Sequence, residues 1–202
     1  MPEVASRTPR LGVRSAGGSG ERGGPALETQ VSSKRIYAGR IVSLRVDEVE
    51  TPGGRRTTRE VVERPDTVSV LAIDEENRAL LVRQFRYVAN VDSLEIPAGT
   101  IDAGESPAEA ARRELREETG YDCDILEELV SYHPAIGYCS ERMTVFLARQ
   151  LRRSPLRGDE EDIRVERVAF EDVYISVAEG RSPFHDAKSS MAVLLARARG
   201  KA

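Results

Sequence analysis

The sequence predicts an α+β fold or an α/β/α sandwich, in which several strands are mixed with a few helices. Two observations carry this prediction. Short apolar runs with strand-like alternation recur along the chain, and other segments have the capping residues and apolar spacing of helices. The 202 residues are 40% hydrophobic and 32% charged, which is enough apolar material to bury one core of ordinary size.

The chain divides into three parts. Residues 1–26 contain six Gly, three Pro and three Ser, and such a segment gains too little apolar burial to offset the entropy lost on ordering. We therefore expect 1–32 to be a flexible tail, 33–64 to be an antiparallel N-terminal sheet, and 65–202 to be the main domain. The N-terminal sheet should contain strands at 34–38, 41–49 and 56–63, with a Thr-Pro-Gly-Gly turn at 51–54.

The main domain begins with strand-like segments. Residues 68–73 and 79–82 flank a turn at 74–77 and should form a hairpin. The remaining expected elements are strands at 143–148 and 165–169, a helix at 171–179, a helix at 187–198 behind a cap at Asp186, and a solvated acidic loop at 159–162.

One helix is delimited by its own residues. Ser106 followed by Pro107 and Glu109 fits a capping box with Pro at the first helical position. Gly120 supplies the stop, because glycine readily adopts the left-handed conformation that ends helices. These signals predict a helix over residues 107–119.

Three carboxylates share one face of this helix. At 100° per residue, Glu114, Glu117 and Glu118 fall within roughly 100° of arc beside the apolar face, while Arg112 and Arg116 point outward. Their mutual repulsion costs stability, as does the negative charge in the last helical turn. Converging carboxylates beside a buried edge are what a hard divalent cation requires. The residues alone leave an alternative open, in which these charged side chains simply form the solvent-exposed face of a helix.

Composition argues against several other classes. No stretch approaches about 18 uncharged apolar residues, so no transmembrane helix is predicted and no membrane partner is expected. The net charge of −4 argues against a general nucleic-acid binder. Cys123 and Cys139 are too few for a disulfide framework, lack zinc-site spacing, and are expected to be free thiols of a cytoplasmic protein. His133 and His185 also lack metal-ligand spacing.

A longer pattern surrounds the carboxylates. Gly99, then Glu105, then the run RELREETGY at 113–121 resembles the Nudix box at every fixed position, with Tyr121 where an aliphatic residue is usual. So long a match favours the cation site over the solvated face. Other segments resemble the ADP-ribose pyrophosphatase branch of the Nudix hydrolases, and the resemblance spans about 33–200. These segments are 37–39, 59–65, 82–86, 95–99, 134–138 and 186–188.

The resemblance implies a fold, a reaction and a cation site. The fold is the Nudix α/β/α sandwich with a mixed sheet, and the reaction is hydrolysis of ADP-ribose to AMP and ribose 5-phosphate with Mg²⁺, for which Mn²⁺ can substitute. The implied ligands are Glu114, Glu118 and the backbone carbonyl of Ala98, with Glu117 as a further ligand. A cation suits this chemistry because pyrophosphate cleavage develops charge on phosphate oxygens.

The resemblance also gives catalytic roles to residues around the cation. Arg113 is expected to orient the carboxylates, and Glu105 to pair with a basic residue. Glu141, on a loop past the box, matches the acidic residue that activates the water. The residues alone leave another reading open for Glu141, an ordinary surface carboxylate paired with Arg142.

Four residues are expected to contact the substrate. Arg64 and Arg86 suit phosphate because Arg binds it in a bidentate manner, although both can also be exposed strand arginines. Arg59 and Tyr37 are the candidates for adenine recognition, and Arg59 stands where some relatives carry an aromatic residue.

The resemblance further implies a homodimer that exchanges the N-terminal sheet, so that each site draws on both chains. Two other functions remain open from the sequence. One is hydrolysis of a different nucleoside diphosphate derivative, such as GDP-mannose, a UDP-sugar or a dinucleotide. The other is a sensor that binds a nucleotide without hydrolysing it. Sensors commonly lose box carboxylates, whereas Glu114, Glu117 and Glu118 are all present.

Overall fold

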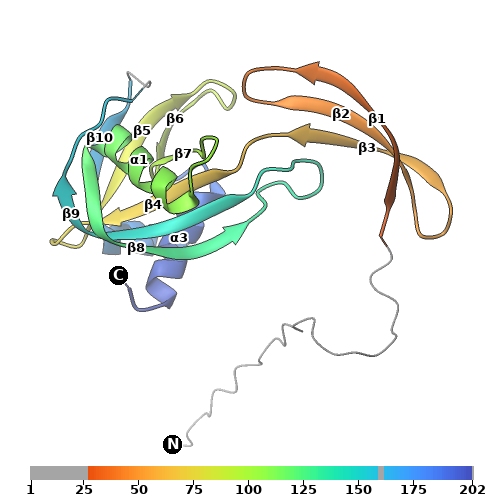
Figure 1. The fold of residues 1–202 in the computed structure, drawn as a ribbon. Coiled ribbons are helices and arrows are strands. Elements are labelled where there is room, and N and C mark those ends of the chain that lie inside the picture. Colours follow the sequence, from red (N-terminus) through yellow and green to blue (C-terminus); the bar gives the residue numbers. More distant parts are fainter. Residues whose placement is uncertain (1–26, 159–161, 202) are drawn as a thin grey trace, which may run out of the picture.

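The computed structural model describes residues 27–158 and 162–201. Residues 1–26 of the expected tail and 159–161 of the expected acidic loop therefore lie outside the described residues. The described chain forms one sheet of three strands and one of seven (Figure 1). The smaller sheet projects from one end of the body that the larger sheet and the helices form.

The smaller sheet is antiparallel and follows chain order. Its strands are β1 (Thr29–Ala38), β2 (Ser43–Glu50) and β3 (Arg56–Glu63). The strand β1 begins before the expected start at 34, so residues 29–32 of the segment expected as a tail belong to this strand instead. Thr29 pairs with Glu50 and Gln30 with Val49, and this backbone pairing extends a strand whose side chains are all exposed.

The larger sheet is mixed, as expected. The strands β4 (Thr67–Ile73) and β9 (Met143–Arg153) run parallel at its centre, and its other pairs are antiparallel. The order is β10-β5-β4-β9-β8, with β6 beside β5 and β7 beside β4. The remaining bounds are β5 (Arg78–Arg86), β6 (Val91–Glu95), β7 (Ala98–Thr100), β8 (Tyr121–Tyr132) and β10 (Arg164–Ala169).

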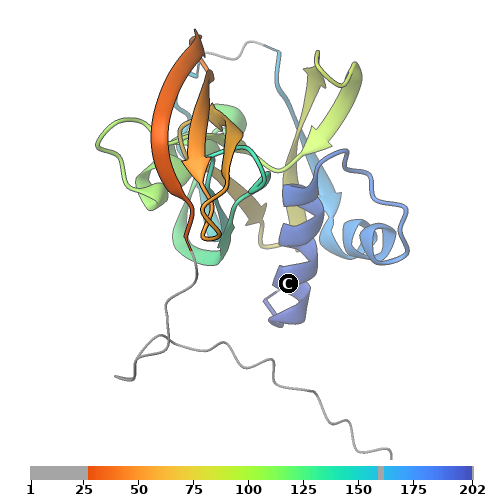
Figure 2. The same ribbon diagram turned by 90° about the vertical axis from the view of Figure 1, so that its right-hand side faces the viewer.

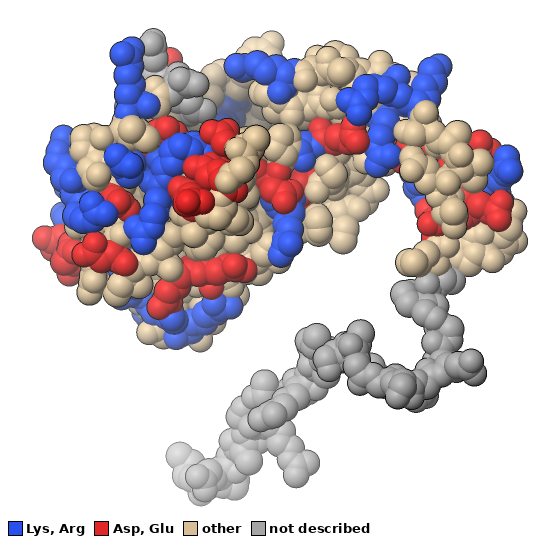
Figure 3. Space-filling view, in the orientation of Figure 1, with Lys and Arg blue, Asp and Glu red and all other residues tan. Residues whose placement is uncertain are grey.

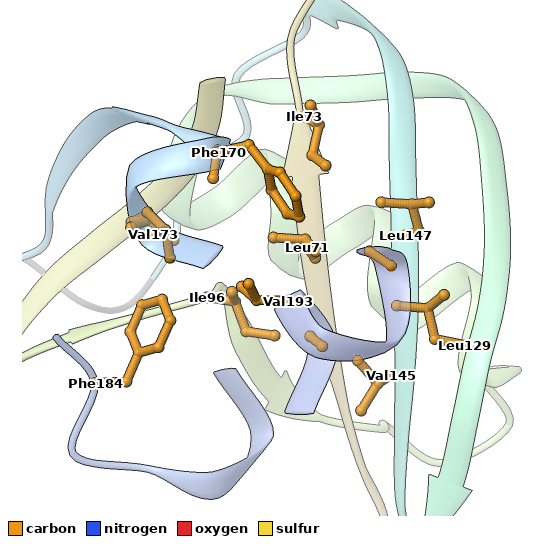
Figure 4. Close-up of a cluster of buried hydrophobic side chains, with 14 of the residues drawn as sticks. Leu71, Ile73, Ile96, Leu129, Val145, Leu147, Phe170, Val173, Phe184 and Val193 are labelled. Atoms are coloured by element: carbon orange, nitrogen blue, oxygen red, sulfur yellow. The ribbon is translucent and has the colours of Figure 1, made fainter. Parts of the chain in front are cut away.

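Helices cover both faces of this sheet, which confirms the α/β/α sandwich (Figure 2). On one face α1 (Pro107–Thr119) packs Ala111 and Leu115 against Val70 and other residues of β4. On the other face, α2 (Phe170–Ala178) and α3 (Ala187–Ala198) pack Phe170, Val173 and Val193 against Leu71 and its neighbours (Figure 4). All seven residues of β4 are buried because helices cover both faces, and its second half, residues 70–73, is a continuous apolar run.

Three strands of the larger sheet were not expected. They are β6, β7 and β8. The strand β8 carries Asp122, Asp124, Glu127 and Glu128, residue types that are depleted in strands. It forms because it pairs with β9 along its length, with a bulge between Glu128 and Val130. The other two have only five and three residues and lie on either side of Pro97, so neither is long enough to show the alternation that identifies a strand.

The two sheets are joined by a junction over residues 64–66, and a second segment is bound to it. The loop over 133–142, between β8 and β9, donates Ser140 N–H to Val62 O at 3.0 Å and accepts Val62 N–H on Tyr138 O at 2.8 Å. The end of β3 and this loop therefore form one hydrogen-bonded unit at the edge of the main body. The three helices of the described residues have 13, 9 and 12 residues, fewer than the roughly 18 apolar residues that a membrane-spanning helix needs.

Candidate active site

Capping residues at both ends of α1 set where the helix begins and ends, and so where its three carboxylates lie along the helix axis. The Ser106 hydroxyl accepts the Glu109 N–H and the Glu109 carboxylate accepts the Ser106 N–H, so the expected capping box forms. Gly120 ends the helix at a φ of 79° and donates its N–H to Arg116 O at 3.0 Å. The helix therefore runs over the range expected from the sequence.

The three carboxylates of α1 line one pocket of about 440 Å³, here called the carboxylate pocket. Its other wall is β7, where the Ala98 N–H donates to Glu118 Oε2 at 3.2 Å. A Cβ added to Gly99 would lie 1.9 Å from Glu114 Oε1, so glycine at this position leaves the room that the buried Glu114 carboxylate occupies. Figure 3 shows acidic and basic side chains side by side over α1.

Arg113 connects this pocket to the loop before the helix. It donates to Glu105 (2.9 Å), Glu114 (2.7 Å) and Glu117 (3.2 Å), and also to Thr100 O at 2.8 Å. The hydrogen bond to Glu105 is the main cause that raises the pKa of the Arg113 guanidinium, and the same bond lowers the pKa of Glu105. The basic partner expected for Glu105 is thus Arg113.

Two arginines expected to point outward do not stand free in solvent. Arg112 Nη1 donates to Asp122 Oδ1 at 2.8 Å, and Arg116 Nε donates to Ser154 O at 3.0 Å. Both side chains are half-buried because β8 and the segment after β9 pass alongside the helix. The two arginines link α1 to these neighbouring segments, and the three carboxylates lie on the side of the helix that faces β7.

The donors of the carboxylate pocket fit a hard divalent cation by their chemistry. Glu114, Glu117, Glu118 and the carbonyl of Ala98 offer only oxygen atoms, and Gly99 leaves no side chain in the way. In the described ranges, however, no three acidic, His or Cys side chains are arranged around a common point. Two of the carboxylates instead contact Arg113, so holding a cation requires an exchange of partners.

A second pocket, of about 550 Å³, adjoins the first and is here called the arginine pocket. The two share Ala98, Gly99 and Thr100, so β7 is a common wall. Arg64 and Arg86, two of the expected substrate contacts, line it together with Glu141. It also contains Glu95 and Lys188, which were not expected in the site, and Asp186, which was expected only as the cap of the last helix.

The other two expected substrate contacts line neither of these two pockets. Arg59, on β3, pairs with Glu28, and Tyr37, on β1, packs against Gly39. The N-terminal sheet contributes different residues through its β1–β2 loop. Arg40 lines the carboxylate pocket and Ile41 lines the arginine pocket. Both lie in the short connection over residues 39–42, although Ile41 was expected to belong to a strand over 41–49.

Glu141 is not the surface residue of the alternative reading. It is 7% exposed, accepting from Thr67 Oγ1 at 2.7 Å and from Arg64 Nη1 at 3.2 Å. Arg142 instead donates to Ser131 Oγ at 2.7 Å. A buried carboxylate with two fixed donors at the edge of a pocket is suited to orient or deprotonate a bound water.

Glu95 is the centre of a buried charge cluster in the arginine pocket. Its oxygens accept from Arg86 at 2.7 and 2.8 Å and from Lys188 Nζ at 2.6 Å. Burial alone would raise the pKa of Glu95, but the bonds from Arg86 and Lys188 outweigh it and lower the pKa to about 2. Sequence reasoning missed this cluster because Glu95 and Lys188 lie 93 positions apart.

This cluster should make the stability of the protein depend on pH. The folded pKa of Glu95 lies below its ordinary value of 4.5, so its contribution is present above pH 4.5 and is lost as pH falls toward 2. At pH 7 we expect Glu95→Gln to lower the free energy of unfolding by up to about 3 kcal/mol. Urea unfolding should show this difference shrinking between pH 5 and pH 2.5. The exposed Glu75→Gln serves as control, and a difference independent of pH would contradict the account.

Two family models match the chain. The model of the NUDIX domain matches residues 63–189, and the model of the nucleoside diphosphate sugar hydrolase N-terminal domain matches residues 28–62. The two matches meet at the end of β3, where the smaller sheet joins the larger one.

Several named proteins are similar to this chain over more than half of its length. The ADP-ribose pyrophosphatase of Bacillus subtilis (strain 168) is 34% identical over 82% of this chain and 90% of its own length. The methanol dehydrogenase activator of Bacillus methanolicus is 36% identical over the same shares. The ADP-ribose pyrophosphatase of Mycobacterium tuberculosis (strain ATCC 25618 / H37Rv) is 41% identical over 60% of this chain and 59% of its own.

One solved structure also resembles the fold closely. The crystal structure of an ADP compounds hydrolase has a TM-score of 0.76 and 26% identity, covering 87% of this chain and 97% of that one.

Proposed function

The chain belongs to the Nudix family, and from this premise we propose that it hydrolyses the pyrophosphate bond of ADP-ribose with Mg²⁺ as its cation. The products are AMP and ribose 5-phosphate. Two of the relatives described above are ADP-ribose pyrophosphatases. The observation that carries the proposal is an acidic pocket and an arginine-lined pocket on either side of one short strand, β7. A pyrophosphate lying across β7 would meet both.

The carboxylate pocket is the proposed cation site. Glu114, Glu117, Glu118 and the carbonyl of Ala98 would hold the ion, for which Mn²⁺ can substitute. When bound, the cation neutralises charge that develops on the phosphate oxygens. Arg113 is a positioning residue because it contacts two of these carboxylates and anchors them to Glu105.

Glu141 is the proposed base. It accepts a proton from a water that attacks one phosphorus of the pyrophosphate. The bond from that phosphorus to the bridging oxygen breaks, and the bridging oxygen leaves with the other phosphate. Attack at either phosphorus gives AMP and ribose 5-phosphate. The protonated carboxylate then returns its proton to solvent, so the atoms and charges balance.

Arg64 and Arg86 are the proposed contacts to the phosphates, because both line the arginine pocket and guanidinium groups bind phosphate oxygens in a bidentate manner. The Glu95 carboxylate accepts hydrogen bonds from Nε and Nη2 of Arg86 and so holds the guanidinium in one orientation. Substrate binding thus meets a guanidinium that is already oriented, which lowers the entropic cost of binding.

We extend the proposal to a homodimer that exchanges the N-terminal sheet. All ten residues of β1 are exposed, including Ile36 and Tyr37, and a long exposed strand is a surface that another chain can cover. Arg59 and Tyr37 would then contact adenine in the partner's site, because neither lines the two pockets of its own chain. A cytoplasmic location accords with two unpaired cysteines, Cys123 and Cys139.

The full chain incubated with ADP-ribose and Mg²⁺ should release AMP and ribose 5-phosphate in equal amounts, and EDTA should stop the release. GDP-mannose, a UDP-sugar and a dinucleotide tested in parallel should react more slowly. If one of these compounds is hydrolysed faster than ADP-ribose, that compound takes the place of ADP-ribose as the proposed substrate. Tight binding of ADP-ribose without hydrolysis would favour the nucleotide sensor. Light scattering of the same sample should give twice the 22.3 kDa of one chain.

A further inference from the structure

Thr67 stands at the start of β4 and touches the proposed base directly. Its hydroxyl donates to Glu141 Oε1 at 2.7 Å, across 74 positions of sequence, and its side chain is 3% exposed. The other carboxylate oxygen accepts from Arg64 Nη1 at 3.2 Å. Two donors, one on each oxygen, fix the plane of a carboxylate, whereas one donor leaves it free to rotate.

The backbone of the loop that carries Glu141 is held by other bonds. Thr67 N–H donates to Arg142 O at 2.9 Å, and Arg142 N–H donates to Asp66 Oδ1 at 3.0 Å. His133 Nδ1 lies 2.9 Å from Glu141 O, and Ser140 is bound to Val62 as described above. None of these bonds uses the Thr67 hydroxyl. Removing that hydroxyl therefore leaves the loop in place and changes only what the carboxylate contacts.

We propose that Thr67 is a positioning residue, which acts by holding the Glu141 carboxylate toward the substrate pocket through its hydroxyl. The inference rests on the role proposed for Glu141. A base must present a lone pair within hydrogen-bond distance of the proton it takes, so its rotation affects the chemical step more than substrate binding. Arg64 donates only one hydrogen bond to Glu141 and is also proposed to bind the phosphates, so it cannot by itself fix the plane of the Glu141 carboxylate.

Thr67→Val keeps the shape of the side chain and the backbone bond but removes the hydroxyl. We expect it to lower kcat roughly tenfold, the size of effect typical of a lost hydrogen bond to a charged group, with KM unchanged. Thr67→Ser restores the donor and should restore kcat. The matched control is Thr144→Val, the same substitution at a buried position of the adjacent strand β9, and it should leave both constants unchanged.

A double-mutant cycle separates positioning from a structural role. Glu141→Gln alone should lower kcat by about 10²-fold or more. In that background Thr67→Val should cost nothing further, because the group through which it acts is gone. A full tenfold loss on top of Glu141→Gln, or wild-type kcat in Thr67→Val, would overturn the inference while leaving the base assignment intact. Wild-type kcat in Glu141→Gln would overturn both.

Discussion

Replacing Glu118 with Gln is expected to lower kcat for ADP-ribose by roughly 10³-fold, because a bound cation contributes several kcal/mol to such a reaction. The carboxylate is one of three that face the carboxylate pocket, and the uncharged amide of Gln does not supply the negative charge that attracts a hard cation. The amide oxygen of Gln can still accept the Ala98 N–H that Glu118 accepts now, so the link between α1 and β7 survives. The loss should therefore appear in activity and in cation affinity, with the thermal unfolding curve nearly unchanged.

Two measurements check this expectation. Steady-state kinetics over a range of Mg²⁺ concentrations should show the loss in kcat, and titration with Mn²⁺, followed by its electron spin resonance signal, should show weaker binding. The matched control is Glu109→Gln on the same helix, because Gln also serves at that capping-box position and the side chain faces solvent. Near-normal kinetics of Glu118→Gln would remove this residue from the proposed cation site.

The parts of the fold that could be predicted are those whose signals are local. The helix α1 has its capping box at Ser106 and its stop at Gly120, so both ends follow from a few adjacent residues. Helical periodicity alone also puts Glu114, Glu117 and Glu118 on one side. The strand β8 was missed for the opposite reason, because its acidic residues disfavour a strand and only pairing with β9 makes it one.

The parts of the site that could not be predicted depend on contacts between distant segments. Glu95 meets Lys188 across 93 positions and Thr67 meets Glu141 across 74, and neither pair has a spacing that a sequence pattern encodes. The contact of Arg64 with substrate stays a prediction, and the structure shows that its guanidinium donates to Glu141. The carboxylates of the helix, Glu141 and the two arginines could be named from the sequence, whereas their hydrogen-bond partners could be found only in the fold.

Gly99→Ala is expected to lower kcat by about 10²-fold while changing the free energy of unfolding by less than about 1 kcal/mol. Gly99 lies in β7 opposite Val68, and its backbone does not have the positive φ at which an added Cβ causes strain. The strand therefore accepts alanine. The added Cβ would instead lie 1.9 Å from Glu114 Oε1 and 2.0 Å from its Cδ, so the carboxylate must turn away.

This separation of activity from stability can be tested with a matched substitution. Gly53→Ala places a methyl group where nothing lies within 4 Å, again without a positive φ, and should leave kinetics and unfolding unchanged. If Gly99→Ala acts through Glu114, it should add little to the loss caused by Glu114→Gln, since both remove the same carboxylate from the pocket. Additive losses would mean that the methyl group displaces something else, and wild-type kinetics would mean that the Glu114 carboxylate does not need the space above Gly99. These outcomes distinguish two reasons for a glycine at position 99, a conformation that the backbone needs or the space that the Glu114 carboxylate occupies.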